Sequence, residues 1–190
     1  MSLVVLTGPV RSGKSAAAER LAGARGSQVT VAVAGWDGDE EMERRIEAHR
    51  KARPDGWNVC LVGPEASWVA DVPPAVVLML DCLGTLVGTI AHESAGQAEV
   101  ASAEAERDSQ RRCDALVAAL TGREGDTIVV TNEAGWGVVP GSASGRLFRD
   151  LLGRANRTLI AAADAAYLVV GGRLLDLSDL PAEAAWPTCD

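Results

Sequence analysis

The sequence lacks the features of membrane, secreted and nucleic-acid-binding proteins. Its longest uninterrupted apolar run, around Ala75–Leu80, is far shorter than the ~20 residues that a transmembrane helix needs. The first residues carry no basic segment followed by an apolar run, so we expect a cytoplasmic protein. The formal net charge is −8, whereas sequence-independent binding to nucleic acid needs a basic surface. We therefore expect neither a membrane span nor a nucleic-acid partner.

Cysteines are few and are not clustered. Cys60, Cys82, Cys113 and Cys189 lie too far apart in sequence for a metal knuckle or a Cys-x-x-Cys redox pair, so we expect buried, reduced thiols. The chain of 190 residues is 47% hydrophobic, which is enough to build a core. We therefore expect a single domain over residues 1–190.

Apolar runs alternate with segments of helical composition. The expected strands are Leu3–Leu6, Val29–Ala34, Val59–Val62, Ala75–Leu80, Thr127–Val130 and Tyr167–Val170. The expected helices are Ala16–Ala24, Asp39–Ala52, a long solvated helix or helix pair over Glu93–Leu120, and Arg146–Ala163. Gly171-Gly172 is suited to turn the last strand into Leu174–Leu177 as a terminal hairpin. This order predicts an α/β fold, a mostly parallel sheet with helices on both faces and a C-terminal β-hairpin.

A glycine-rich loop follows the first expected strand. Its sequence, Gly8-Pro9-Val10-Arg11-Ser12-Gly13-Lys14-Ser15, matches the Walker A pattern G-x-x-x-x-G-K-[ST]. Glycines allow successive backbone N–H groups to point at phosphate oxygens, and the start of the following helix adds positive potential. Lys14 is expected to reach the β- and γ-phosphates, and the Ser15 hydroxyl is expected to bind Mg²⁺. The loop therefore predicts a nucleoside triphosphate ligand.

Polar residues follow two of the buried strands. Asp81 ends one strand, where a Walker B carboxylate would hold Mg²⁺, although it is also suited to an ordinary turn. Asn132 and Glu133 follow another strand and are expected to face the same crevice, with capping or turn formation as the alternative.

The two histidines differ in their surroundings. His49 lies on one helical stripe with Met42 and Ile46, and a histidine in such a position is more often packed than catalytic. His92 begins a polar region and suggests no role.

Several segments beyond the glycine-rich loop carry specific combinations of residues. They are TGPVRSGKS at 7–15, DEEMERRIEAHRKARPDGW at 39–57, LDCL at 80–83, TNEAGWGVVP at 131–140 and GRLFRDLLGRANRTLIAAADAAYLVV at 145–170. Together they resemble the family of bifunctional adenosylcobinamide kinases / adenosylcobinamide-phosphate guanylyltransferases of cobalamin biosynthesis. The resemblance extends from residue 3 to about residue 172.

This resemblance implies a RecA-like P-loop NTPase fold, a homotrimer and a corrinoid substrate, adenosylcobinamide. ATP or GTP would phosphorylate its hydroxyl, and GTP would then guanylylate His49, which matches the histidine of the family pattern E-M-x-x-R-I-x-x-H. A neutral imidazole is a suitable nucleophile at cellular pH, while Lys14 and Mg²⁺ would neutralise the departing pyrophosphate. In a trimer, Arg146, Arg149 and Arg154 would hold phosphate or pair with Asp150, or form an ordinary charged helix face. Of these, Arg146 and Arg149 are expected in the substrate or nucleotide crevice with Asn132 and Glu133.

The chain departs from the family pattern in two places, which keeps other interpretations open. Gly84–Thr89 lacks the family's Trp and Asn, and Val59–Val62 stands where the family has Thr and acidic residues. One alternative is a kinase-only or substrate-shifted relative without guanylyl transfer. Another is a regulatory RecA-type nucleotide-binding protein, which would leave the segments at 133–140 and 146–156 without a purpose.

Overall fold

The apolar runs form one seven-stranded sheet in the computed structural model, which describes residues 1–26, 28–35, 54, 56–96 and 98–182. Its order is β3-β2-β4-β5-β1-β6-β7. All neighbouring strands are parallel except β6 and β7, which form an antiparallel hairpin. The strands are β1 (Leu3–Thr7), β2 (Val29–Ala34), β3 (Asn58–Val62), β4 (Val77–Asp81), β5 (Thr127–Val130), β6 (Ala165–Val170) and β7 (Arg173–Asp176).

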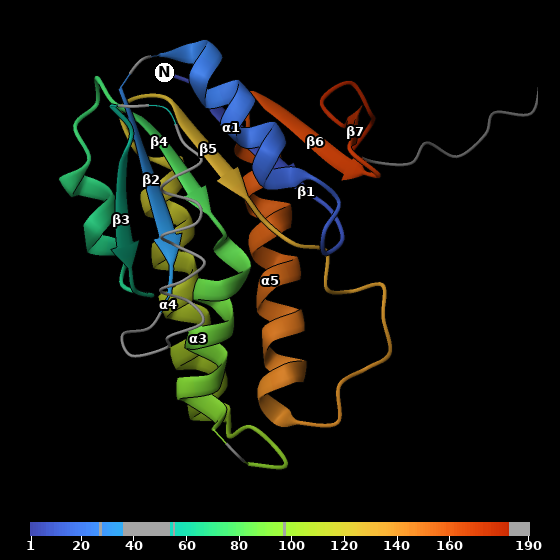
Figure 1. The fold of residues 1–190 in the computed structure, drawn as a ribbon. Helices are drawn as coiled ribbons and strands as arrows, with labels where there is room; N and C mark the ends of the chain where they lie inside the picture. Colours follow the sequence, from blue (N-terminus) through green and yellow to red (C-terminus); the bar gives the residue numbers. More distant parts are fainter. Residues whose placement is uncertain (27, 36–53, 55, 97, 183–190) are drawn as a thin grey trace, which may run out of the picture.

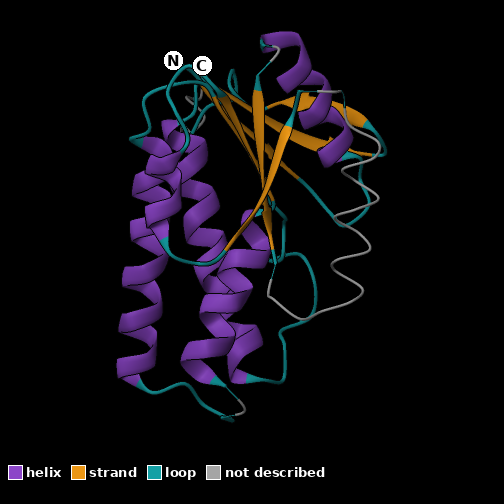
Figure 2. Ribbon diagram, turned by 60° about the vertical axis from the view of Figure 1, so that its left-hand side comes forward, coloured by secondary structure: helices purple, strands orange, loops and turns teal. Residues whose placement is uncertain are grey.

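Helices cover both faces of this sheet. Figures 1 and 2 show α1 on one face and the bundle of α3, α4 and α5 on the other. The helices are α1 (Lys14–Arg25), α3 (Leu83–Ala95), α4 (Ala103–Thr121) and α5 (Ala143–Ala162), with a short 3-10 helix, η1, at Ala66–Asp71. Since successive side chains of a strand point to opposite faces, Leu78 and Leu80 pack toward the bundle while Val77 and Met79 pack toward α1.

The strand order positions the glycine-rich loop. β5 lies between β1, which leads into Gly8, and β4, which ends at Asp81. In the register of the sheet, Val130 of β5 is paired with both Leu6 and Asp81. The segment after β5 therefore leaves the sheet between the loop and Asp81.

The expected strands and the terminal hairpin are confirmed, and one helical region differs from the expectation. The predicted helix pair over Glu93–Leu120 begins too late, because α3 already starts at Leu83 and a loop separates it from α4. Gly and Thr are poor helix formers, and the buried Leu86 and Ile90 make α3 a core helix whose packing overrides that propensity. Nor is α4 solvated all round, since four apolar side chains on one face are buried: Cys113, Leu116, Val117 and Leu120.

The thiols are only partly as expected. Cys113 is buried, whereas Cys60 and Cys82 are half-buried, and all three are free. Cys189 and the helix predicted over 39–52 lie outside the described residues. Within the described part of the chain, no helix is both long and apolar enough to cross a membrane.

Candidate nucleotide-binding site

The glycine-rich loop joins the end of β1 to the start of α1. Gly8 and Gly13 adopt φ values of 147° and 99°, which L-residues with a side chain rarely adopt, and Arg11 between them has φ 58°. Gly13 is the N-cap of α1. This curled backbone ends at a helix N-terminus, where free N–H groups and the helix dipole attract anions. The loop thus has the architecture of a phosphate site.

The C-terminal hairpin supports this loop from the side. The Gly172 N–H donates a hydrogen bond of 2.8 Å to the Ser12 carbonyl. A Cβ atom on Gly8 would lie only 2.3 Å from the Val169 carbonyl oxygen, and one on Gly13 would lie 3.3 Å from the Gly172 Cα. The sequence predicted the hairpin but not its contact with the phosphate loop, because the pairing of β6 with β1 is a tertiary feature.

Lys14 lies over the loop rather than in solvent. Its side chain is buried, and Nζ donates to the carbonyl oxygens of Gly8 at 3.0 Å and Pro9 at 2.7 Å. Burial lowers the pKa of Lys14 below its ordinary value, and the nearby charges of Cys82 and Asp81 oppose that shift. The ammonium group is therefore fixed beside the N-terminus of α1.

The two residues predicted to hold Mg²⁺ are in contact. The Ser15 hydroxyl donates to Asp81 Oδ1 at 3.1 Å, although the residues come from α1 and the end of β4. A hydroxyl and a carboxylate supply the hard oxygen ligands that Mg²⁺ prefers. The described residues contain no group of three or more His, Cys, Asp or Glu side chains suited to a metal, which is compatible with Mg²⁺ because that ion usually keeps several waters. The pair therefore fits the expected ion.

Glu133 contacts the residues at the start of the loop. Its backbone N–H donates to the Gly8 carbonyl at 3.2 Å, and its Oε1 accepts the Thr7 hydroxyl at 2.6 Å. Asn132 lies next to it, and its side chain is about 3.5 Å from where a Cβ atom on Gly84 would stand. Both predicted residues thus lie where the ends of β1, β4 and β5 meet.

Asn156 is a residue that the sequence analysis did not assign. It is buried in α5, and its Nδ2 donates to the Asn132 carbonyl at 2.9 Å and to Glu133 Oε1 at 3.1 Å. One signal was present: Asn156 falls on the apolar stripe of α5 with Leu152 and Leu159. A buried amide on such a stripe needs polar partners, and here these belong to the site.

The predicted arginines lie farther along α5. Arg146 donates to the Pro140, Gly141 and Glu99 carbonyls, and Arg149 Nη2 donates to the Gly135 carbonyl at 2.7 Å. At 1.5 Å rise per residue, they lie about 15 Å and about 10 Å from Asn156 along the helix. The structure therefore does not bring them to the phosphate loop.

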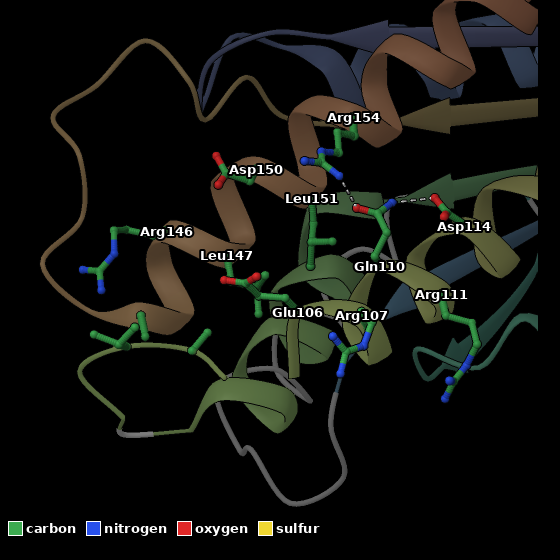
Figure 3. A pocket seen from close by; sticks show the side chains of 13 residues that line it. Glu106, Arg107, Gln110, Arg111, Asp114, Arg146, Leu147, Asp150, Leu151 and Arg154 are labelled. Atoms are coloured by element: carbon green, nitrogen blue, oxygen red, sulfur yellow. Dashed lines mark hydrogen bonds between the residues drawn. The ribbon is translucent and has the colours of Figure 1, made fainter. Parts of the chain in front are cut away.

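A groove of about 750 Å³ lies between α4 and α5 near these arginines (Figure 3). Arg146 lies at one end of the groove, and Arg154 donates to Gln110 Oε1 at 3.1 Å. Among the residues described, no hydrogen bond or ion pair joins Asp150 to Arg146 or Arg154.

His49, the predicted nucleophile, lies outside the described residues, as do Met42 and Ile46.

Comparisons with known proteins identify the family of this chain. Residues 4–177 match the family described as cobinamide kinase / cobinamide phosphate guanyltransferase. The chain is 35% identical over 175 residues to the bifunctional adenosylcobalamin biosynthesis protein CobU of Escherichia coli, covering 90% of this chain and 96% of that protein. It is 30% identical to CobP of Pseudomonas aeruginosa, over 93% of this chain and 98% of that protein.

Among solved structures, a protein of Pyrococcus horikoshii OT3 is similar with a TM-score of 0.49 and 9% identity, over 95% of this chain and 88% of that one. The flagellar accessory protein FlaH of Methanocaldococcus jannaschii has a TM-score of 0.42 and 15% identity, over 91% of this chain and 74% of that one. The long sequence match, together with a phosphate loop and an Asp–Ser pair in the expected places, decides the family. The chain belongs to the cobinamide kinase / cobinamide phosphate guanyltransferase family.

Proposed function

We propose that this chain phosphorylates the hydroxyl of adenosylcobinamide with ATP or GTP, and then transfers GMP from GTP to the resulting phosphate through a guanylyl-histidine. The product is adenosylcobinamide-GDP. The observation that carries the proposal is a phosphate loop in which Lys14 Nζ donates to the loop carbonyls and Ser15 contacts Asp81. This loop occurs in a chain that belongs to the family.

Phosphoryl transfer uses the loop formed by Gly8–Ser15. Its backbone N–H groups bind the phosphates, and Lys14 neutralises charge that develops on them. Ser15 and Asp81 would hold Mg²⁺, which when bound supplies further charge neutralisation on the β- and γ-phosphates. Asn132 and Glu133 lie beside the loop and would line the space that the cobinamide hydroxyl enters.

Guanylyl transfer uses His49 as the nucleophile. A neutral imidazole nitrogen attacks the α-phosphorus of GTP, a P–N bond forms, the P–O bond to the β-phosphate breaks, and pyrophosphate leaves. An oxygen of adenosylcobinamide phosphate then attacks the same phosphorus and releases the imidazole. The support for His49 is its place in the family pattern within the match at 4–177.

The proposal includes a cytoplasmic homotrimer built from one nucleotide-binding domain over 1–190.

An exposed apolar loop near the site is suited to bind a partner subunit or the corrinoid. In this loop Trp136, Val138 and Val139 are 69%, 96% and 63% exposed. Exposed apolar groups that adjoin one another commonly mark a binding surface. Arg149 holds the start of this loop through the Gly135 carbonyl, and Arg146 holds its end, so both arginines would shape that surface.

The test is incubation with GTP labelled at the α-phosphate, followed by product analysis with adenosylcobinamide. The wild-type protein should carry acid-labile, base-stable label, and His49→Ala should carry none. His92→Ala is the matched control and should label normally, because His92 lies in α3 away from the phosphate loop. Phosphate product without protein label would favour the kinase-only alternative, and formation of neither product would refute the proposal.

A further inference from the structure

The carboxylate of Glu133 is held by only one of its two oxygens. Oε1 accepts hydrogen bonds from the Thr7 hydroxyl at 2.6 Å and from Asn156 Nδ2 at 3.1 Å. Oε2 receives no hydrogen bond from any residue that the structure describes. Two donors on one oxygen fix the direction of the carboxyl group and leave the second oxygen available as an acceptor.

The amide of Asn156 is itself oriented by its neighbours. The Thr131 hydroxyl donates to Asn156 Oδ1 at 2.7 Å, while the Asn132 carbonyl and Glu133 Oε1 lie on the nitrogen side. Because both of those groups are acceptors, only the NH₂ group can satisfy them. Thr131 and Asn156 are buried, so this arrangement is rigid and a change in it is costly.

The network lies at the phosphate loop. Thr7 is the last residue of β1, and the Glu133 N–H donates to Gly8, the first residue of the loop and the partner of Lys14 Nζ. β5, which leads into Glu133, lies between β1 and the strand that ends at Asp81. The Glu133 carboxylate therefore lies beside the loop, after the strand that separates β1 from the strand ending at Asp81.

We infer that Glu133 accepts the proton of the attacking hydroxyl during phosphoryl transfer, and that Asn156 is the positioning residue that holds this carboxylate. The inference rests on the proposed function. As the hydroxyl oxygen forms its bond to the γ-phosphorus, its O–H bond breaks and the proton moves to Oε2 of Glu133. The bond between the γ-phosphorus and its bridging oxygen breaks, and the nucleoside diphosphate leaves with that electron pair.

The two proposed reactions differ in their need for such a base. The cobinamide hydroxyl must lose a proton, whereas a neutral imidazole attacks through a free lone pair and loses none. The phosphate oxygen that later takes the GMP group is already ionised. Loss of Glu133 should therefore affect the kinase reaction and spare guanylylation of the protein.

Glu133→Gln is the matched perturbation. Glutamine keeps an acceptor oxygen for Thr7 and Asn156 and replaces only the free oxygen with NH₂. We expect kcat for phosphoryl transfer to fall by about 10²–10⁴-fold, with KM for the nucleotide within about threefold and guanylylation from labelled GTP close to wild type. Glu124→Gln, an exposed residue beyond α4, is the control and should leave both reactions unchanged. A normal kinase kcat in Glu133→Gln would overturn the inference, and so would loss of both reactions, since that would make Glu133 a nucleotide or metal ligand.

Asn156→Leu tests the positioning role. It should lower the kinase kcat by up to about a hundredfold, with little change in KM for the nucleotide or in guanylylation, which also shows that the variant is folded. If Asn156 acts through Glu133, adding Asn156→Leu in the Glu133→Gln background should cause no further loss. Additive losses would overturn the positioning role, as would equal loss of both reactions in Asn156→Leu. A wild-type protein that forms neither product would instead refute the proposed function.

Discussion

Gly8 has no room for a side chain between the phosphate loop and the sheet, so Gly8→Ala tests how the loop is built. The new Cβ would stand 2.3 Å from the Val169 carbonyl oxygen, a backbone atom of β6 that cannot turn aside. β6 is paired with β1 in register from Val4 to Thr7, so the loop and the strand must separate together. Gly8 also has φ 147°, which strains any other L-residue.

The cost has two parts. Overpacking against backbone costs about 1–3 kcal/mol, and the unfavourable φ costs about 1–3 kcal/mol. We therefore expect the free energy of unfolding to fall by about 2–6 kcal/mol, with the melting temperature falling about 2–4 °C for each kcal/mol. Because the Gly8 carbonyl accepts both Lys14 Nζ and the Glu133 N–H, nucleotide affinity should fall by about tenfold or more, which is about 1.4 kcal/mol.

Urea unfolding and titration with a fluorescent GTP analogue measure the two effects. Gly137→Ala is the control, since a Cβ atom there meets nothing within 4 Å and both quantities should match wild type. If Gly8→Ala unfolds at the wild-type urea concentration and binds nucleotide normally, then contact with β6 does not shape the loop, and the reasoning is wrong.

Three other residues give independent predictions. Arg123→Ala removes a buried guanidinium that donates to three carbonyls in the 72–76 segment, and should lower the free energy of unfolding by about 3–5 kcal/mol without changing nucleotide affinity. Ser15→Ala should raise the Mg²⁺ concentration that gives half the maximal kinase rate by about tenfold to a hundredfold, measured by titration with the ion. Burial raises the pKa of Cys113 from 9.0 to about 11, so its stabilising contribution is full below pH 9.0 and is lost as the pH rises through about 11. Urea unfolding across this range should show a shallower loss in Cys113→Ala.

The strands were predictable from sequence because each is an apolar run bounded by turn residues. β5, for example, occupies the predicted Thr127–Val130. The start of α3 was not predictable by the same means, since Gly84 and Thr85 disfavour helix in isolation. Burial of the helix against α5 decides its conformation, and that information lies in residues far along the chain.

The residues of the site also fall into those that could be predicted from sequence and those that could not. The phosphate loop is contiguous in sequence, so its glycines could be recognised directly. The position of Asp81 at the end of β4 was predictable because the end of a buried strand is recognisable. The partners of Glu133 come from β1 and α5, and Asn156 is separated from Glu133 by 23 residues. Arg146 and Arg149 were assigned to the crevice from a sequence motif, and a motif does not specify where a side chain points. In the structure their side chains donate to the Gly141 and Gly135 carbonyls of the loop before α5.

These contacts explain how one loop can serve two reactions with different requirements. Binding of the triphosphate depends on groups that are local to β1 and α1, which both reactions share. Removal of the proton depends on Glu133, which follows β5 and accepts a hydrogen bond from Asn156 of α5. Glu133 is also hydrogen-bonded to Thr7 of β1 and to Gly8 of the loop, but Asn156 of α5 donates to Glu133 and Asn132 and not to the phosphate loop. A change at Asn156 can therefore alter one reaction without disturbing the binding that both need. This separation means that a kinase-deficient protein that still guanylylates itself is an expected phenotype of substitutions at the Glu133–Asn156 contact, and not of substitutions in the phosphate loop.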